Sequence, residues 1–136
     1  DGELYGRSMT PEHWQRLEGG VLAAVALFAA AMLSGWWWPL ALFLVFDLSA
    51  LGYLASTRMG AFFYNLVHSY WAPPLLLVWA FVDAASADGD LWRLLVLISC
   101  SWFFHVGVDR ALGYGLKRDD SFQHTHLGWI GKAARR

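Results

Sequence analysis

The sequence predicts an all-α protein, a four-helix transmembrane bundle with a short cytoplasmic C-terminal tail. Hydrophobic residues make up 57% of the 136-residue chain and charged residues 15%, against about 25% charged in ordinary soluble proteins. No charged residue occurs between Glu18 and Asp47, a run longer than the roughly 20 residues that one membrane span requires. Finally, lysine and arginine occur mainly at every second connection between the apolar segments, and near the two chain ends. Together these features predict several membrane spans.

The first helix is expected over about 12–34. Residues 1–8 have no apolar periodicity and precede Met9, which resembles a natural start, so we interpret them as an appended segment outside the fold. Thr10 is a suitable N-cap, and Pro11 suits the first helical turn. Small residues on several faces of this helix would permit close contact with another helix in lipid.

A tryptophan-rich turn around Gly35 and Pro39 separates this helix from a second one, over about 38–56. A third helix is expected over about 59–83. It contains two consecutive prolines, which should kink it and free backbone carbonyls.

An acidic segment rich in small residues, 83–90, leads to a fourth helix over about 91–114. The four helices form a transmembrane domain of residues 9–118, and residues 119–136 form the tail. Apart from Arg93, lysine and arginine lie before or near the start of the first helix, between the second and third, or at and after the end of the fourth. Positive charge is in excess on the cytoplasmic side of membrane proteins. Both termini are therefore expected in the cytoplasm, and the protein in a bacterial inner membrane.

Ionisable residues in three of the helices are predicted to lie at one depth. Asp47 and His68 lie eleven and ten residues from Arg58. His105 lies twelve residues from Lys117. At about 1.5 Å per helical residue, each is roughly 15 to 18 Å from the cytoplasmic ends, near the midplane of a hydrocarbon core about 30 Å thick. Because ionisable groups in lipid are costly and usually functional, we expect a shared polar site.

Asp109 extends this site, because it lies one helical turn from His105 on the same face. The candidate catalytic residues, which are also candidate ligands of a zinc, iron or manganese ion, are Asp47, His68, His105 and Asp109. Without a metal, imidazole and carboxylate could act as general acid and base or relay protons. Each residue taken alone could serve only helix packing, but their common depth favours a common site.

The tail adds His124 and His126 as candidate metal ligands, because both rings of a His-x-His segment lie on one side of an extended chain. A solvated tail is the alternative. Aromatic residues make up 17% of the chain, and their rings could lie in interfacial belts or line a pocket for an apolar substrate. The candidate substrate-binding residues are Tyr53, Tyr64, Asn65 and Tyr114.

The charge pattern argues against nucleic acid as the main partner, since the net charge is −1 and no basic stripe runs along any segment. Membrane lipids are the expected partners. The single cysteine, Cys100, excludes an intramolecular disulfide and a cysteine-rich zinc site.

Several motifs together carry a family resemblance. They are Arg16-Leu17-Glu18-Gly19, Asp47-Leu48-Ser49, Tyr64-Asn65-Leu66-Val67-His68, His105-Val106-Gly107, Asp109-Arg110, Gly113-Tyr114-Gly115-Leu116-Lys117 and Thr125-His126-Leu127-Gly128. The chain resembles the small bacterial integral membrane proteins of domain-of-unknown-function family 4260. The resemblance implies a compact four-helix membrane protein and no established activity.

Three classes of function remain open. The leading hypothesis is an intramembrane enzyme, metal-dependent or acid/base, that acts on a lipid-like or isoprenoid-like small molecule. The second is a proton, ion or small-solute transporter acting as a homo-oligomer, although no inverted repeat is visible. The third is a structural or partner-binding membrane subunit whose polar cluster only fixes helix packing. Because no activated serine or cysteine nucleophile is evident, the enzyme hypothesis rests on the His/Asp cluster.

Overall fold

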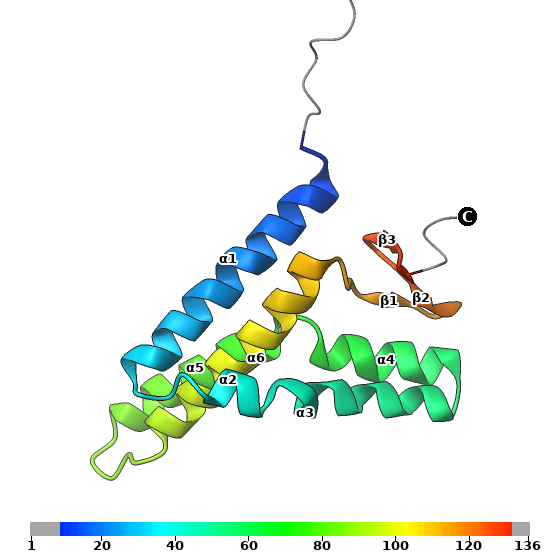
Figure 1. Ribbon diagram of the computed structural model, residues 1–136. Coiled ribbons are helices and arrows are strands. Elements are labelled where there is room, and N and C mark those ends of the chain that lie inside the picture. The colour runs from blue at the N-terminus through cyan, green and yellow to red at the C-terminus, as the bar shows by residue number, and fades with distance from the viewer. Residues whose placement is uncertain (1–8, 132–136) are drawn as a thin grey trace, which may run out of the picture.

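The computed structural model describes residues 9–131, a mostly helical chain that ends in a small sheet. The predicted appended segment, 1–8, and residues 132–136 lie outside the described part. Figure 1 shows α1 beside α6, with α3, the 3-10 helix η1 and α4 extending away from them beneath the strands. The elements are α1 (Pro11–Met32), α2 (Trp38–Ala41), α3 (Phe43–Asp47), η1 (Leu48–Leu54), α4 (Thr57–Val67), α5 (Ala72–Ala84), α6 (Trp92–Leu112), β1 (Lys117–Arg118), β2 (Ser121–Thr125) and β3 (Gly128–Trp129).

The first helix begins as predicted, with Thr10 as its N-cap. The Thr10 hydroxyl accepts a hydrogen bond from the His13 backbone N–H, and the His13 side chain accepts one from the Thr10 backbone N–H, which completes a capping box. Further along, α1 crosses α6 where Gly19 meets Gly107. A Cβ on Gly107 would lie 2.6 Å from the Gly19 carbonyl oxygen and 2.9 Å from the Ala23 amide nitrogen. Glycine therefore permits the close approach that fixes α6 against α1.

The second predicted helix, 38–56, is divided into α2, α3 and η1. Ser49 contributes to this change of geometry, because its hydroxyl donates a hydrogen bond to the Phe46 carbonyl at 2.8 Å. Such bonds from serine to the preceding turn compete with regular helical bonding. The chain therefore continues as a 3-10 helix after Asp47 rather than as an α-helix.

The 3-10 geometry of η1 decides which side chains face the same way. Gly52 lets η1 pack tightly on α4, since a Cβ there would lie 2.9 Å from the Met59 carbonyl oxygen. A 3-10 helix repeats every three residues, so Asp47, Ala50 and Tyr53 lie along one side of this segment. That side faces the cavity described below.

The third predicted helix, 59–83, is two helices, α4 and α5, separated by residues 68–71. The break precedes the two prolines rather than occurring at them. Pro73 and Pro74 lie in the first turn of α5, where proline is tolerated because the first N–H groups of a helix have no partner in any case.

Side chains satisfy the backbone carbonyls at the end of α4. The donors come from the break itself and from α6, so these two segments are attached to the end of α4. The bonds run from Trp71 to Leu66 (2.9 Å), from Trp102 to Val67 (2.6 Å) and from Arg110 to His68 (3.2 Å). A helix can therefore end among apolar side chains without leaving these carbonyls unpaired.

A small sheet corrects the all-α prediction, because the predicted tail folds back on the helices. Gly113 ends α6 in the left-handed conformation (φ 95°), and β1, β2 and β3 then pair antiparallel in that order. The Asn65 amide donates a hydrogen bond to the Lys117 carbonyl at 2.8 Å and accepts one from the Lys117 N–H at 2.6 Å. The His126 ring bonds the Gln15 side chain at 2.8 Å. The sheet is thus attached to both α4 and α1.

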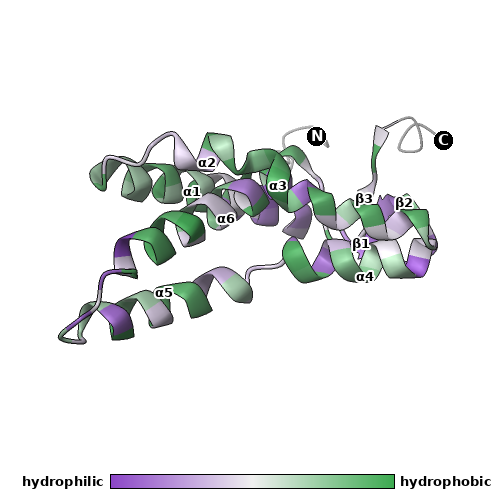
Figure 2. Ribbon diagram, turned by 90° about the horizontal axis from the view of Figure 1, so that it is seen from below, coloured by the Kyte–Doolittle hydropathy of each residue, from purple (hydrophilic) through white to green (hydrophobic). Residues whose placement is uncertain are grey.

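Apolar residues predominate along the helices (Figure 2), and many of their side chains are exposed. On α1, Val25 is 59% exposed and Phe28 67%. On α5, Val78 is 61% exposed and Phe81 77%. Exposed apolar surface on this scale marks contact with a membrane or another protein. By length and composition, α1 and α6 could each cross a membrane.

Candidate metal centre

Four ionisable side chains from three parts of the chain meet where α3, α4 and α6 come together. Asp47 is the last residue of α3, His68 caps the C-terminus of α4, and His105 and Asp109 lie one turn apart on α6. Each offers one ligand atom, and these atoms all lie within 4.8 Å of one another. The predicted convergence of these four residues is confirmed.

The distances suit a single metal ion. The Nε2 atoms of His68 and His105 are 2.9 Å apart. The closest Asp47 oxygen lies 3.4 and 3.6 Å from these two atoms, and the closest Asp109 oxygen 3.4 and 3.8 Å. Four ligand atoms placed tetrahedrally around an ion, with bonds of about 2.0 to 2.1 Å, are about 3.3 Å apart. The four side chains could therefore bind one ion with small adjustments.

Hydrogen bonds orient the His68 ring for this role. Its Nδ1 lies 3.0 Å from the Tyr64 carbonyl oxygen, an acceptor, so Nδ1 carries the proton and Nε2 presents its lone pair to the other three groups. The Tyr64 ring stacks on the imidazole with centroids 3.6 Å apart, and its hydroxyl donates to the Asp109 carboxylate at 3.1 Å. Tyr64 therefore supports two of the four residues at once.

The His105 ring is fully buried and is held by packing instead. Its centroid lies 4.6 Å from that of Phe43 and 5.4 Å from that of Phe46. Within residues 9–131, its Nδ1 has no hydrogen-bond partner. Because the two Nε2 atoms face each other at 2.9 Å, the pair needs either a shared proton or a cation between them.

A cavity of about 310 Å³ adjoins the carboxylate side of this group. Its lining residues are Asp47, Ala50, Tyr64, Asp109, Tyr114, Lys117 and Phe122. The Asp47 side chain is 44% exposed, whereas that of Asp109 is 14% exposed. A small molecule would therefore reach the group past Asp47.

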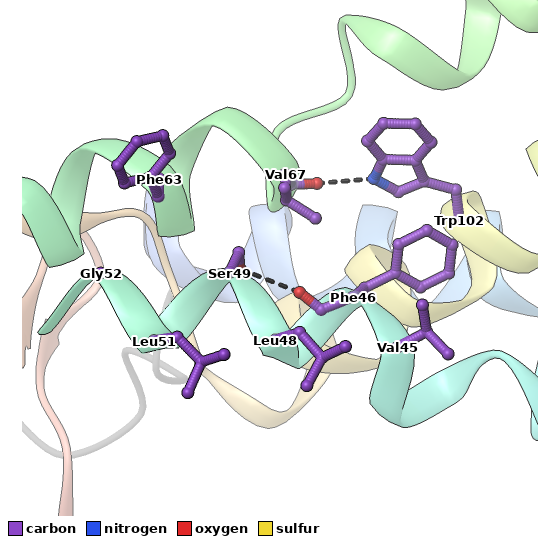
Figure 3. A pocket seen from close by; sticks show the side chains of 9 residues that line it. All are labelled: Val45, Phe46, Leu48, Ser49, Leu51, Gly52, Phe63, Val67 and Trp102. Carbon is purple, nitrogen blue, oxygen red and sulfur yellow. Dashed lines mark hydrogen bonds between the residues drawn. The ribbon is translucent and has the colours of Figure 1, made fainter. Parts of the chain in front are cut away.

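A second cavity, of about 500 Å³, opens between η1 and α4, and Figure 3 shows its mainly apolar lining. From η1 it is lined by Leu48 and Leu51, whereas Asp47 lines the first cavity. Ser49 lies at the boundary, because it lines the second cavity and its Oγ is 3.5 Å from His68 Nδ1. Ser49 therefore lies between the apolar second cavity and the His/Asp group.

The predicted substrate-binding residues have different environments. Tyr114 lines the first cavity, as Tyr64 does. Asn65 instead binds the backbone of β1. Tyr53 packs edge-on against Phe122 with ring centroids 5.1 Å apart, beside the residues that line the cavity.

The two tail histidines lie apart from the four-residue group. His124 bonds Asp120 at 2.7 Å and stacks on Trp129, and this hydrogen bond lowers the pKa of the Asp120 carboxyl. His126 accepts a hydrogen bond from the Leu116 N–H at its Nδ1. Neither belongs to the metal-binding group found in residues 9–131. Both imidazoles instead stabilise the sheet, a role that an extended tail did not suggest.

Sequence reasoning missed Lys117, which it used only as a marker of the membrane edge. The structure buries this lysine beside the cavity, and burial lowers its pKa to about 8. The available signal was a cation between the aromatic residues Tyr114 and Phe122. This pattern indicates a buried lysine only when β1 and β2 are known to form a hairpin.

These features define a class of protein: a largely helical chain with two helices able to cross a membrane and an Asp/His/His/Asp group, its two imidazoles buried, close enough to bind a metal ion. The chain belongs to the family described as Domain of unknown function (DUF4260), whose model matches residues 12–130. The family membership expected from the motifs is therefore confirmed. No curated protein and no solved structure matches the chain.

Proposed function

We propose that this protein is an integral membrane enzyme that uses a divalent metal, held by the four His and Asp residues, to act on a lipid-like or isoprenoid-like substrate. The observation that carries the proposal is the convergence of four ligand atoms within 4.8 Å. Imidazole nitrogen and carboxylate oxygen are ligands that zinc, iron and manganese share. The exposed apolar surfaces of α1 and α5 favour a membrane location, with both termini expected in the cytoplasm.

The coordination number bears on the identity of the metal. A zinc ion with four protein ligands has no free coordination position, as in structural sites. A catalytic ion keeps one position free for water or substrate. Iron and manganese accept more ligands, so either would leave positions free on the side of the cavity. We therefore favour iron or manganese. Such an ion would polarise a carbonyl or phosphoryl oxygen, or acidify a bound water.

The aromatic walls of the cavity support a lipid-like substrate. Tyr114 and Phe122 are 44% and 46% exposed, so their rings form an apolar rim. The polar side chains of Asp47, Asp109 and Lys117 line the cavity beside them. A molecule with a polar end and an apolar body would match this division, because burying the apolar part is favourable only against apolar walls.

Elemental analysis of protein purified in a neutral detergent tests the metal. We expect a stoichiometric amount of one divalent metal, lowered strongly by His68→Ala and His105→Ala. His124→Ala is the matched control, because this histidine bonds Asp120 outside the group. Equal metal content in His105→Ala and the unchanged protein would contradict the proposal.

A structural metal is the second candidate, and the presence of four protein side chains that could all bind one ion is the observation that favours it. The two candidates differ in what Asp47→Asn does to turnover. Metal-loaded protein would be incubated with a total membrane lipid extract, and products identified by mass spectrometry. An enzyme forms a product that disappears in Asp47→Asn and after chelation. A structural site forms none, although chelation still lowers the melting temperature.

A further inference from the structure

Lys117 is a charged residue held inside the protein by aromatic rings. It is 5% exposed, whereas lysine is almost never buried unless paired. Its Nζ lies 4.0 Å from the centroid of the Phe122 ring and 4.9 Å from that of Tyr64. Within residues 9–131, this nitrogen makes neither a hydrogen bond nor an ion pair. Cation–π contacts and the attraction of the nearby Asp109 carboxylate stabilise the ammonium group there.

The position of Lys117 is enforced by its backbone. Asn65 bonds both the N–H and the carbonyl of this residue, so α4 fixes the place of the lysine in β1. The strand alternates, which directs Lys117 inward and leaves Arg118 exposed. The side chain therefore lines the cavity together with Asp47 and Asp109.

Once a divalent cation is bound by the His/Asp group, an anion in the cavity would balance the remaining positive charge of this region. A divalent cation would neutralise the carboxylates of Asp47 and Asp109, because two negative charges face two positive ones. The ammonium of Lys117 would then be an uncompensated charge in a partly dry site, which is costly. The cavity of about 310 Å³ falls at the lower end of the range of small-molecule sites. It has room for a small acidic group between Lys117 and the carboxylates.

We propose that this cavity binds the acidic head group, a carboxylate or a phosphate, of the lipid-like substrate. One oxygen of the head group accepts a hydrogen bond from the Lys117 ammonium, and another faces the Asp/His group. The apolar chain leaves past the exposed rings of Tyr114 and Phe122. Both contacts rest on the proposed function, because the divalent ion neutralises the two carboxylates that line the cavity beside Lys117.

Five probes test this site in metal-loaded protein held in a neutral detergent. Dodecyl phosphate and dodecanoate carry an acidic group on an apolar chain, and dodecanol carries the same chain without charge. Inorganic phosphate and acetate carry the charge without the chain. Affinities are measured by titration calorimetry for the unchanged protein and for Lys117→Met, Lys117→Arg and Arg118→Met.

We expect Lys117→Met to bind dodecyl phosphate or dodecanoate about 10- to 100-fold more weakly, since a hydrogen bond to a charged group contributes roughly 1.5 to 3 kcal/mol. Binding of dodecanol should not change. Lys117→Arg should recover most of the affinity, because it restores the charge. Arg118→Met, a neighbouring exposed cation, should bind like the unchanged protein.

Equal binding of both acidic amphiphiles by Lys117→Met and the unchanged protein would overturn the proposal. So would a parallel loss of dodecanol binding, because that loss reports a damaged cavity rather than a lost charge. Equal affinity for inorganic phosphate and dodecyl phosphate would overturn the lipid assignment and identify a soluble anion as the ligand.

A second variant keeps the test decisive if Lys117→Met does not fold. Ala50→Trp fills the cavity while Lys117 remains, and it should abolish binding of dodecyl phosphate, whereas Ala55→Trp at an exposed position should not. Elemental analysis of the titrated protein separates this proposal from the previous one. Lys117-dependent binding in a protein that holds no metal supports the head-group site and overturns only the metal. Stoichiometric metal without any effect of Lys117 or Ala50 overturns only the head-group site.

Discussion

Replacing His105 with alanine should remove the stabilisation that a metal provides while leaving the fold intact. The imidazole is fully buried, and its contacts are the rings of Phe43 and Phe46 and the Nε2 atom of His68. Alanine is the best helix former, so α6 should remain helical. In the metal-free protein, the loss is limited to packing and one hydrogen bond.

The size of the effect follows from the coupling of metal binding to folding, because an ion that binds only the folded state stabilises that state. A ligand at 100 times its dissociation constant stabilises the folded state by about 2.7 kcal/mol. For a chain of this length, about 3 to 4 °C per kcal/mol gives a rise in melting temperature of about 10 °C. Loss of a ligating ring should weaken metal binding by at least the roughly 100-fold known for supporting residues. The stabilisation at the same metal concentration then falls to about 0.4 kcal/mol, a shift of about 1 to 2 °C.

Thermal melting in detergent, with and without added metal, measures both shifts. His124→Ala serves as the control and should keep the full shift, because His124 contacts Asp120 and Trp129 instead. The double variant of His68 and His105 should lose little more than either single one, since groups that act as a unit are not additive. A shift of about 10 °C in His105→Ala would refute the reasoning.

Four further outcomes are expected. Gly107→Ala should destabilise the protein by about 1 to 3 kcal/mol in chemical denaturation, whereas Gly20→Ala, whose added Cβ would meet only the Ala111 side chain at 3.7 Å, should not. Asn65→Leu should accelerate hydrogen exchange of the Lys117 amide, because that N–H loses its acceptor. Burial lowers the pKa of Lys117 from 10.5 to about 8, so the unfolded chain binds the proton more tightly than the folded one. The free energy of unfolding, relative to that of Lys117→Met, should therefore increase as the pH is raised from about 8 to 10.5. Reporters fused at residue 87 and at the C-terminus should lie on opposite sides of the membrane, and finding them on one side would exclude the four-span topology.

The meeting of the His and Asp residues was predictable because it depends on spacing alone. His105 and Asp109 share a face in any helix. Asp47 and His68 lie at similar distances along the chain from Arg58, and the 3-10 form of η1, which rises about 2.0 Å per residue instead of 1.5 Å, changes the depth of Asp47 by only about 3 to 4 Å. The prediction therefore did not depend on details of helix geometry.

The remaining features depend on tertiary contacts that the sequence does not reveal. The 3-10 form of η1 comes from the Ser49 hydroxyl and from packing of Gly52 on α4. The break after His68 is stable because Trp102 and Arg110, far along the chain, supply donors to its carbonyls. The sheet consists of short strands without a clear period-2 pattern, which is the main sequence signal for strands.

The attachments of the sheet also set an order of events during folding. Gln15 meets His126 across 111 residues of chain, whereas Asp47 and Asp109 of the His/Asp group are only 62 residues apart. Contacts so distant in sequence close late, because the chain entropy is lost before the contact is gained. The four His and Asp residues precede β1, so they can assemble while the wall formed by Lys117 and Phe122 is still absent. We expect a metal ion to enter during this interval, before the hairpin narrows access to the group.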